Sequence, residues 1–423
     1  MAQKPFRITL SIGEVVGDYS ILKLIGRGGY GDIYKVREIH SKTNYAMKIE
    51  EIENERQGLL QEKEVIQRLN SKCFPQIIEY GENYVNRYLV QELCGPSFSA
   101  MRKFLPDGHF SLSTVLRIGI EMLKAIRKLH NAGYIHRDIK PSNFLIRPNK
   151  KHPVALIDFG LCYQYKDFET GQYIDYESTL EKKSDNQYLT YEDFDQRRYV
   201  GTPRYMSLNA HGGKEPGRVD DLYSWFYSLI EIFRGCLPWA RFVNIEDIKE
   251  VKMRIDGTIL AQGMPHQMTS IFRVIRRMNL EDDPDYDLIT SFLVDAMKSI
   301  GAKWDDPYEW EVMDISSISS IPFMYDPNDV SKKIPENLPE PVLPSVEVSN
   351  NIPEILPRQI SEGKFQSKET GQIQCQITEQ RTRRRSYNEN NEDVEMVVQQ
   401  SKNYNYYTNR RGSTKRPLNI PRF

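Results

Sequence analysis

The sequence predicts an α+β protein with a strand-rich first part, a helix-rich second part and a C-terminal tail of low order. Apolar and polar residues alternate across much of residues 19–92, which is typical of strands. From Ser113 onward apolar residues recur at the spacing of helix turns. After residue 315 the composition changes, and eight prolines occur by residue 360. A segment of that composition buries too little apolar surface to offset its chain entropy.

Turn residues separate the strand patterns of the first part, and one helical pattern interrupts them. Residues 1–18 precede the first strand pattern and are predicted to form an N-terminal extension. The strand patterns cover residues 19–26, 31–39, 44–52 and 77–93, and the helical pattern covers residues 57–70.

The clearest helix of the second part is predicted between Ser113 and Gly133, where the glycine is a suitable terminator. The most apolar window, residues 222–233, is too short to span a bilayer and contains Glu231, so we predict a buried helix there. The residues that define the apolar face of the first helix are Val115, Leu116, Met122, Leu123, Ile126 and Leu129.

The balance of basic and acidic residues gives little information about function, but it gives no reason to expect two classes of partner. The 423 residues include 57 basic and 58 acidic side chains, so the net charge gives no electrostatic reason to expect nucleic acid or an anionic membrane. The five cysteines are scattered and lack metal-ligand spacing, which favours a reducing compartment. The amino terminus shows no signal-peptide pattern. We expect a cytoplasmic protein and a monomer.

Residues 315–423 are predicted to be a tail of low order with basic clusters at residues 381–385 and 410–416. Short basic runs act as nuclear-localisation or docking signals in some proteins, and as plain solvated charge in many others. The tail therefore leaves the nucleus open as a second compartment.

A glycine-rich loop, Gly-Arg-Gly-Gly-Tyr-Gly, occupies residues 26–31. Isolated matches to this pattern are usually plain turns, and the dinucleotide-binding variant requires the loop to open a helix. Here the following residues alternate like a strand, which favours a β-hairpin whose backbone can close over nucleotide phosphates.

Lys48 lies in the strand pattern that follows the glycine-rich loop, where a fixed cation could meet phosphates. A strand lysine is more often a solvated surface residue. Glu62 on the predicted helix changes that balance, because an ion pair with Lys48 would hold the ammonium toward the phosphates. Glu64 is the nearby competitor, but it lies about 200° around the helix from Glu62.

The strongest signal is the segment His136-Arg137-Asp138-Ile139-Lys140-Pro141-Ser142-Asn143, followed by Asp158-Phe159-Gly160. Phosphoryl transfer needs an oriented hydroxyl, metal ions and positive charge beside the migrating group. Asp138 would accept the proton of the hydroxyl, and Lys140 can reach the γ-phosphate. Asn143 and Asp158 supply oxygen ligands for Mg²⁺, which needs few protein oxygens. Taken alone, each of these residues is more often a turn or capping residue. Turn and capping roles do not explain why all of them occur together.

These motifs together resemble the protein-kinase signature. Ser207-Leu208-Asn209 stands where most kinases carry Ala-Pro-Glu, which resembles the casein kinase 1 superfamily. The sequences of residues 140–144 and 218–221 are similar to those of its tau-tubulin kinase branch. The resemblance runs from Tyr19 to Trp310, and its further motifs lie at residues 93–97, 220–227 and 235–239.

The resemblance implies a bilobal protein-kinase fold over residues 19–314, with an N-lobe over 19–92, a C-lobe over 93–314 and an insertion in the activation segment over 164–196. It implies ATP and Mg²⁺ as cofactors, protein substrates, and Asp138, Lys140, Lys48 and Glu62 as catalytic residues. Asp221 would support the backbone of the His-Arg-Asp segment, Thr202 would bond near Asp138 and Lys140, and His136 would be structural. The implied nucleotide-binding residues are Ile25, Gly26, Gly28, Gly31, Ile33, Ala46, Lys48, Glu92, Leu93 and Leu145.

Three features depart from the family pattern. The resemblance implies a hinge between the lobes at Glu92 and Leu93. Gln91 lies behind this hinge, where the family often has methionine, and a buried amide without partners there costs about 1–3 kcal/mol. The stretch from Asp167 to Asp195 is rich in Tyr, Asp and Glu and is predicted to be mobile, with Arg137 as a candidate partner for a phosphate on it. Arg204 and, more weakly, Arg218 are candidates for binding acidic or already phosphorylated substrates, or else are surface ion-pair partners.

An active serine/threonine kinase is the leading hypothesis. A pseudokinase or scaffold is the second, and loss of any of Lys48, Asp138, Asn143 or Asp158 would have favoured it, yet all are present. A Rossmann-type nucleotide-binding enzyme is the third, and the strand after the glycine-rich loop disfavours it.

Overall fold

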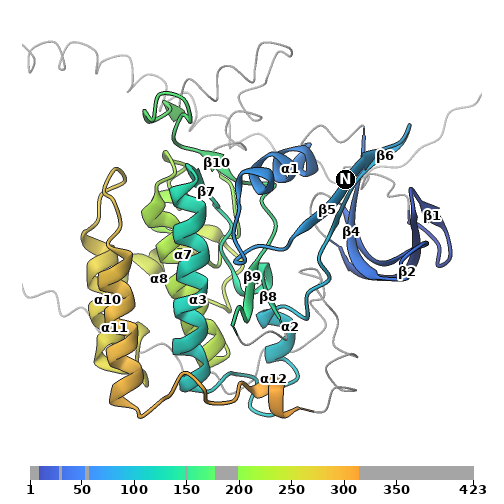
Figure 1. Ribbon diagram of the computed structural model, residues 1–423. Coiled ribbons are helices and arrows are strands. Elements are labelled where there is room, and N and C mark those ends of the chain that lie inside the picture. The colour runs from blue at the N-terminus through green and yellow to red at the C-terminus, as the bar shows by residue number, and fades with distance from the viewer. Residues whose placement is uncertain (1–8, 28–30, 53–56, 148–150, 177–198, 314–423) are drawn as a thin grey trace, which may run out of the picture. The chain divides into compact units, whose positions relative to one another are not determined.

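The structure is a computed structural model that describes residues 9–27, 31–52, 57–147, 151–176 and 199–313. The predicted tail and its basic clusters, Gly28, and residues 177–196 of the predicted insertion lie outside the described residues. Figure 1 shows the strand-rich part with helix α1 beside the helix-rich part.

The first part is a six-stranded antiparallel sheet with the order β1-β2-β3-β4-β6-β5. Alternating residues of these strands bury one apolar face, which includes Tyr34, Val36 and Met47. The predicted strand and helix patterns of this part are confirmed. The elements are β1 (Val15–Val16), β2 (Tyr19–Arg27), β3 (Asp32–Glu38), β4 (Asn44–Glu51), α1 (Gly58–Arg68), β5 (Ile77–Glu82) and β6 (Asn86–Gln91).

Strands β2 and β3 are antiparallel neighbours, with Gly26 opposite Ile33 and Arg27 opposite Asp32. The glycine-rich loop therefore connects two strands, as predicted. Gly31 has to be glycine, because a Cβ atom there would lie 2.0 Å from the carbonyl oxygen of Ile49. The close approach of β3 to β4 at this point brings the loop next to the strand that carries Lys48.

The second part is helical. Helix α3 confirms the predicted helix, begins with the Ser111 side chain as its N-cap, and is followed by Gly133 with a φ of 82°. Helix α7 packs against α3, and the indole of fully buried Trp225 donates a hydrogen bond to the Gly119 carbonyl at 3.1 Å. The helices are α2 (Phe98–Arg102), α3 (Leu112–Asn131), α6 (Leu208–His211), α7 (Arg218–Arg234), α8 (Ile245–Arg254), α9 (Gly257–Leu260), α10 (His266–Arg277), α11 (Tyr286–Ser299) and α12 (Glu309–Val312).

Short elements of the second part flank the motifs singled out in the sequence. They are the antiparallel pair β7 (Tyr134–Ile135) with β10 (Tyr163–Gln164), the antiparallel pair β8 (Phe144–Ile146) with β9 (Val154–Leu156), and the 3₁₀ turn η1 (Pro141–Asn143). Among the described residues, every helix is too short or too polar to cross a membrane.

Asp221, in the first turn of α7, fixes the backbone of the segment that precedes Asp138. Its buried carboxylate accepts the His136 N–H at 2.7 Å and the Arg137 N–H at 3.0 Å. It also lies 2.8 Å from Nε2 of buried His130. Burial acts to raise the pKa of Asp221, but the hydrogen bonds from His130 and from the His136 backbone lower it below its usual value. The support expected from Asp221 is confirmed.

Replacing Asp221 by Asn should destabilise the fold. The amide oxygen can accept fewer of the three donors, so at least one buried N–H loses its partner, at a cost of about 1–3 kcal/mol. The free energy of unfolding from urea denaturation tests this. The control is Asp295→Asn on α11, which removes an exposed ion pair with Lys298 and should change stability by less than about 0.5 kcal/mol. Equal losses in both variants would contradict the role given to Asp221.

Candidate active site

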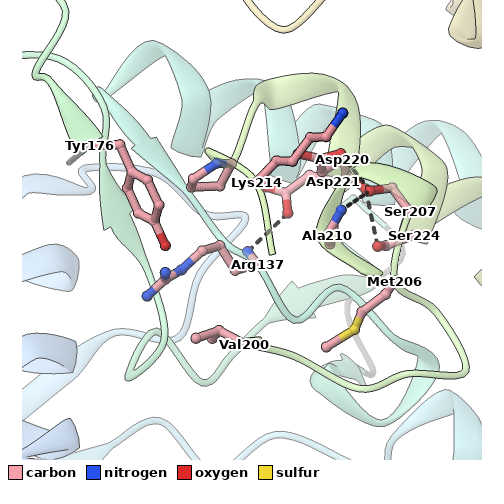
Figure 2. Close-up of a pocket in the computed structure, with 11 residues that line it drawn as sticks. Arg137, Tyr176, Val200, Met206, Ser207, Ala210, Lys214, Asp220, Asp221 and Ser224 are labelled. Atoms are coloured by element: carbon pink, nitrogen blue, oxygen red, sulfur yellow. Dashed lines mark hydrogen bonds between the residues drawn. The ribbon is translucent and has the colours of Figure 1, made fainter. Parts of the chain in front are cut away.

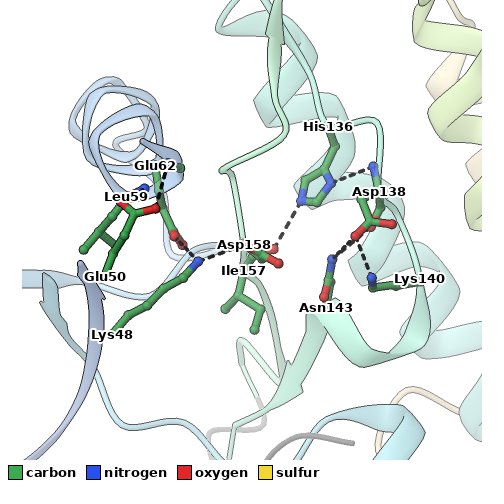
Figure 3. Close-up of polar contacts among 11 residues, drawn as sticks. Lys48, Glu50, Leu59, Glu62, His136, Asp138, Lys140, Asn143, Ile157 and Asp158 are labelled. Atoms are coloured by element: carbon green, nitrogen blue, oxygen red, sulfur yellow. Dashed lines mark hydrogen bonds and ion pairs between the residues drawn. The ribbon is translucent and has the colours of Figure 1, made fainter. Parts of the chain in front are cut away.

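Lys48 on β4 meets two carboxylates from distant parts of the chain (Figure 3). Its Nζ lies 2.5 Å from Oε2 of Glu62 on α1 and 2.9 Å from Oδ1 of Asp158. Lys48 and Glu62 are almost fully buried, whereas the Asp158 side chain is 24% exposed. The predicted pair of Lys48 with Glu62 is confirmed, and Glu64 is exposed as expected.

The charges of this trio depend on one another. Burial opposes the charge of Lys48, but Asp158 and Glu62 outweigh it and raise the pKa of the ammonium. Burial also opposes the charge of Asp158, yet Lys48 holds the pKa of that carboxyl below its usual value. For Glu62, burial outweighs Lys48 and raises the pKa. Asp158, which is more exposed and has the lowered pKa, is therefore the better anionic ligand of the two.

Glu50 positions the helix that carries Glu62, a role that the sequence patterns did not reveal. Its buried carboxylate accepts the backbone N–H groups of Gly58 and Leu59, each at 3.1 Å. These are the first residues of α1, whose own N-cap residue, Gln57, makes no side-chain capping bond. A carboxylate at this end satisfies unpaired N–H groups and complements the helix dipole. A single acidic residue in a strand carries no local signal for such a role.

Asp138 lies in a set of hydrogen bonds that fixes its carboxylate. Oδ1 accepts the Thr202 hydroxyl at 2.7 Å, and Oδ2 lies 2.6 Å from Lys140 Nζ. Lys140 also donates to Thr202 at 3.0 Å, which confirms the contacts expected of Thr202. Asn143 donates its amide N–H to the Asp138 carbonyl at 2.9 Å. The Asn143 amide oxygen accepts no hydrogen bond within the described part of the chain and stays available to a ligand.

His136 connects the Asp138 segment to the Asp158 segment. Its Nδ1 accepts the Asp138 N–H at 3.3 Å, so the ring proton lies on Nε2, which donates to the Ile157 carbonyl at 3.2 Å. Phe159 is fully buried and packs edge-on against His136 and Phe74. The structural role expected of His136 near the Asp-Phe-Gly turn is confirmed.

Two residues of the site have left-handed backbone conformations, Arg137 with a φ of 67° and Asp158 with a φ of 68°. Such conformations cost a non-glycine residue about 1–3 kcal/mol and persist only where surrounding contacts impose them. Here Asp221 fixes the Arg137 N–H and Lys48 holds the Asp158 side chain. The constraint aims Asp158 into the site.

The residues expected to bind a nucleotide come from β2, β3, β4 and β8, from the glycine-rich loop and from the segment after β6. Ala46 on β4 is buried opposite Gln91, and Ile25 of β2 is buried nearby in the sheet. Leu145 belongs to a small buried cluster that is separate from the main core. The cluster consists of Cys94, Leu145, Ala155 and Ile157. The structure describes all of the expected residues except Gly28, and it packs Cys94 of the 93–97 motif against Leu145.

Gln91 is buried, and its Oε1 finds no hydrogen-bond partner within the described part of the chain. The sequence raised this concern for a polar amide behind the hinge. An amide oxygen left in this state costs about 1–3 kcal/mol.

The first part of the predicted insertion is packed, which corrects the expectation of a mobile loop for residues up to Tyr176. Residues 166 and 173 form a β-bridge, and Tyr176 is buried against Tyr163 with ring centroids 5.2 Å apart. The Tyr173 hydroxyl accepts a hydrogen bond from Arg218 at 2.8 Å. Tyr163, Tyr165 and Tyr176 provide the apolar surface that the acidic composition concealed.

Arg218, the weaker candidate for an anion-binding residue, is buried rather than open to substrates. Besides Tyr173, it contacts the Asp283 carboxylate and donates to the Glu281 carbonyl at 3.0 Å. Its guanidinium also lies 5.1 Å from the ring centroid of Tyr165. Arg218 therefore ties the packed part of the insertion to the segment before α11.

Side chains hold four successive carbonyls of the segment that follows Thr202. Lys252 donates to the carbonyls of residues 203 and 206, each at 2.7 Å. Trp239 donates to the Arg204 carbonyl at 2.7 Å, and Ser224 donates to that of residue 205 at 2.9 Å. The Arg204 side chain is 44% exposed and lies 3.3 Å from buried Glu231. The backbone after Thr202 is thus fixed by α7, α8 and the residues between them.

Lys252 of α8 is a buried amine whose polar neighbour is His211, with Nζ 3.1 Å from Nε2. Burial lowers the pKa of Lys252 to about 6. Burial and the charge of Lys252 lower the pKa of His211 to about 4. A neutral amine fits this arrangement, because its lone pair can accept the His211 Nε2–H while its two N–H groups serve the carbonyls.

A small cavity lies between the Arg137 segment and the start of α7 (Figure 2). Arg137 and Tyr176 line one side, and Ser207, Lys214 and Asp220 line the other. Its volume of about 30 Å³ is on the scale of a water molecule. Arg137, the candidate phosphate partner, donates its Nε–H to the Leu161 carbonyl at 2.6 Å.

Comparison with known proteins places the chain in a family. Residues 19–298 match the protein kinase domain. Because this match covers more than half of the chain, the chain belongs to the protein kinase family. A Dictyostelium discoideum protein named a probable serine/threonine-protein kinase is 33% identical over 316 residues, covering 74% of this chain and 60% of that protein. The casein kinase I homolog of Kluyveromyces lactis is 33% identical over 302 residues, covering 69% and 53%.

A Caenorhabditis elegans protein, also named as a serine/threonine-protein kinase, is 33% identical over 311 residues, covering 72% of this chain and 85% of that protein. The chain thus spans between half and two thirds of the length of the first two relatives. The bilobal fold expected from the motifs, with a strand-rich sheet before a helical part, is that of this family.

The lowered pKa of Lys252 should make stability depend on pH. An amine with a pKa of about 6 when folded and an ordinary lysine pKa when unfolded binds fewer protons in the folded state. Stability relative to Lys252→Met should therefore rise with pH between 7 and 9, by up to about 1.4 kcal/mol per pH unit. Urea denaturation across this range measures it, with Lys298→Met as the control for losing a lysine. Parallel curves for wild type and Lys252→Met would contradict the prediction.

Proposed function

We propose that this protein is a serine/threonine protein kinase that transfers the γ-phosphate of ATP to serine and threonine hydroxyls of protein substrates. The observation that carries the proposal is the Asp138 carboxylate held by Thr202 and Lys140, together with Lys48 held between Glu62 and Asp158. One set can orient a hydroxyl and the other can orient phosphates, which is what phosphoryl transfer asks of a protein.

Asp138 is proposed as the base. Its Oδ1 and Oδ2 are already oriented by a hydroxyl and an ammonium, so a substrate hydroxyl can donate to it and pass it the proton as the oxygen attacks. Lys140 lies beside that carboxylate and would stabilise negative charge on the transferred group. Lys48, kept charged by its two carboxylates, would neutralise the α- and β-phosphates, with Glu62 fixing its position.

Asn143 and Asp158 fit a magnesium site. The Asn143 amide oxygen is left available by the bonds of its N–H₂ group, and the pKa of Asp158 is lowered, so both offer the hard oxygen ligands that Mg²⁺ prefers. Bound Mg²⁺ would neutralise phosphate charge. The left-handed backbone at Asp158 holds that side chain toward Lys48 and toward the side of the site where phosphates would lie.

We propose that the protein belongs to the casein kinase 1 superfamily and lies closest to its tau-tubulin kinase branch. Support comes from Ser207 and Asn209 of the Ser-Leu-Asn segment, which bond the Asp220 carboxylate at 2.5 and 3.0 Å. Asp220 also accepts the Gly217 N–H at 2.8 Å, so this segment is anchored to the start of α7. The likeness to a casein kinase I homolog agrees with this placement. We further propose a cytoplasmic monomer, with the nucleus as a second compartment.

A pseudokinase or scaffold is the alternative function. The hydrogen-bonded set around Asp138 disfavours it, because a protein that only binds partners has no need to orient this carboxylate. The β2–β3 hairpin at the glycine-rich loop disfavours the Rossmann alternative.

Phosphate incorporation by the purified chain tests the proposal. Wild type should label casein or itself with γ-labelled ATP, whereas Asp138→Asn and Asp158→Ala should lose at least about a hundredfold of the rate. Asp295→Asn makes the same substitution as Asp138→Asn at an exposed aspartate, and it should keep the wild-type rate. Equal labelling by wild type and both active-site variants would overturn the mechanism, and absence of labelling by wild type would favour the scaffold.

We also propose that Arg204 helps to select acidic or already phosphorylated substrates. Arg204 is half exposed, follows Thr202 closely in the chain, and retains N–H groups beyond the one that faces Glu231. Arg102 lies 3.9 Å from the same glutamate, so two cations flank this position. A phosphate or carboxylate near the target hydroxyl would fit such a surface.

Matched peptides with and without a phosphoserine near the target residue test this selection. Wild type should prefer the phosphopeptide, and Arg204→Ala should lower that preference by about tenfold while leaving the rate with the plain peptide similar. Arg277→Ala, which removes an exposed arginine of α10, is the matched control. A preference that is unchanged in Arg204→Ala, or absent in wild type, would contradict the proposal.

A further inference from the structure

Arg147, which directly follows β8, is a buried arginine that joins three separate segments. Its Nη2 donates to the Phe74 carbonyl at 2.7 Å, and its Nη1 donates to the carbonyls of Lys72 and, at 3.3 Å, Val154. The rest of the guanidinium faces Glu92, with Nε 2.9 Å from Oε1 and Nη2 2.8 Å from Oε2. The pair with Glu92 is therefore two-pronged, which is the strongest geometry between these groups.

Glu92 is the first residue after β6, and its side chain is turned toward Arg147. Oε2 also accepts the Gln76 N–H at 3.3 Å, and the Glu92 N–H donates to the Gln76 carbonyl at 2.8 Å. Burial acts to raise the pKa of Glu92, but the hydrogen bonds and charge of Arg147 lower it below its usual value. The Glu92 side chain is thus committed to contacts within the protein.

The segment after Glu92 runs beside β8. The Gly95 N–H donates to the Ile146 carbonyl at 2.8 Å, and the Ile146 N–H donates to the Pro96 carbonyl at 2.9 Å. A β-bridge joins Ser97 to Leu145. Backbone bonds therefore fix residues 95–97 to β8, and the Arg147 side chain fixes the other end of the same segment at Glu92.

We propose that Arg147 is a positioning residue for the adenine of ATP. Arg147 holds the segment from Glu92 to Cys94 at a set distance from Leu145. The inference rests on the proposed kinase function. Leu145 and Cys94 share one small buried cluster, so the separation between β8 and this segment sets the width of the space beside that cluster. Arg147 reaches across that separation from a position two residues beyond Leu145.

Arginine suits this task better than lysine or an apolar residue. Its planar group serves one carboxylate and three carbonyls at once, with five N–H donors in a fixed geometry. Removing it would leave the Glu92 carboxylate, which is 37% exposed, without its partner, and it would free three carbonyls. The segment after β6 could then move away from β8, which would weaken its contacts with a base without touching the phosphate side.

Calorimetric titration of the full chain with adenosine, ADP and ATP with Mg²⁺ tests the proposal. Arg147→Met should weaken all three ligands by a similar factor, roughly threefold or more, because only the adenosine part meets the displaced segment. Lys48→Met should instead weaken ADP and ATP much more than adenosine. Glu92→Gln keeps the shape of the side chain but loses its charge, and it should weaken adenosine in the same direction as Arg147→Met. The double variant should bind no more weakly than Arg147→Met alone.

Each outcome decides the question. Unchanged adenosine binding in Arg147→Met, or a loss confined to ADP and ATP, would overturn the inference even if the thermal stability falls. If Arg147→Met does not fold, adenosine binding by Glu92→Gln decides alone, with unchanged binding overturning the inference. Wild-type protein that binds none of the three ligands would overturn the proposed function and this inference with it, whereas wild-type binding with unaltered variants would overturn only the inference.

Discussion

The ammonium of Lys48 is the point on which the arrangement of the candidate site depends. A charge this deeply buried is tolerated only beside opposite charge, and its two partners come from different parts of the chain, Glu62 on α1 and Asp158 after β9. The requirement to neutralise one lysine therefore fixes a helix of the first part and a turn of the second part against β4. Glu50 contributes from the same strand, because it holds the first turn of α1 and so sets where Glu62 can reach.

The motifs predicted much of the fold and the site because their signals are local. Period-two patterns mark strands such as β2 and β3, and the three-to-four spacing marks α3, since each follows from the geometry of a single element. Lys48, Asp138, Asn143 and Asp158 were found because each lies in a short pattern with a characteristic spacing. Contacts of these residues could be anticipated where a family pattern supplied the partner.

The sequence did not predict Glu50, Lys252 or Arg147, and the reason is physical. Each is a single charged residue whose partners lie elsewhere: the Glu92 partner of Arg147 is 55 residues away, and the carbonyls that meet Lys252 are 46 and 49 residues away. Nothing in the local pattern distinguishes such a residue from a solvated charge. The packing of the insertion up to Tyr176 was missed for a related reason, since its acidic composition outweighed the tyrosines that bury its inner side.

Helix α7 supports the residues around Asp138 and after Thr202, which the proposed function assigns to the protein substrate. Its first turn supplies Asp221 to the backbone before Asp138 and Asp220 to the Ser-Leu-Asn segment, and further along Ser224 and Glu231 hold the residues after Thr202. None of these contacts involves Arg147, Glu92 or Lys48. Under the proposed function, a change at Glu92 or Arg147 should therefore alter nucleotide binding while the surface after Thr202 keeps its shape. In the proposed kinase, the contacts of α7 would position the protein substrate and those of Lys48 and Arg147 would position the nucleotide, and Lys140 and Thr202 meet at Asp138 between them.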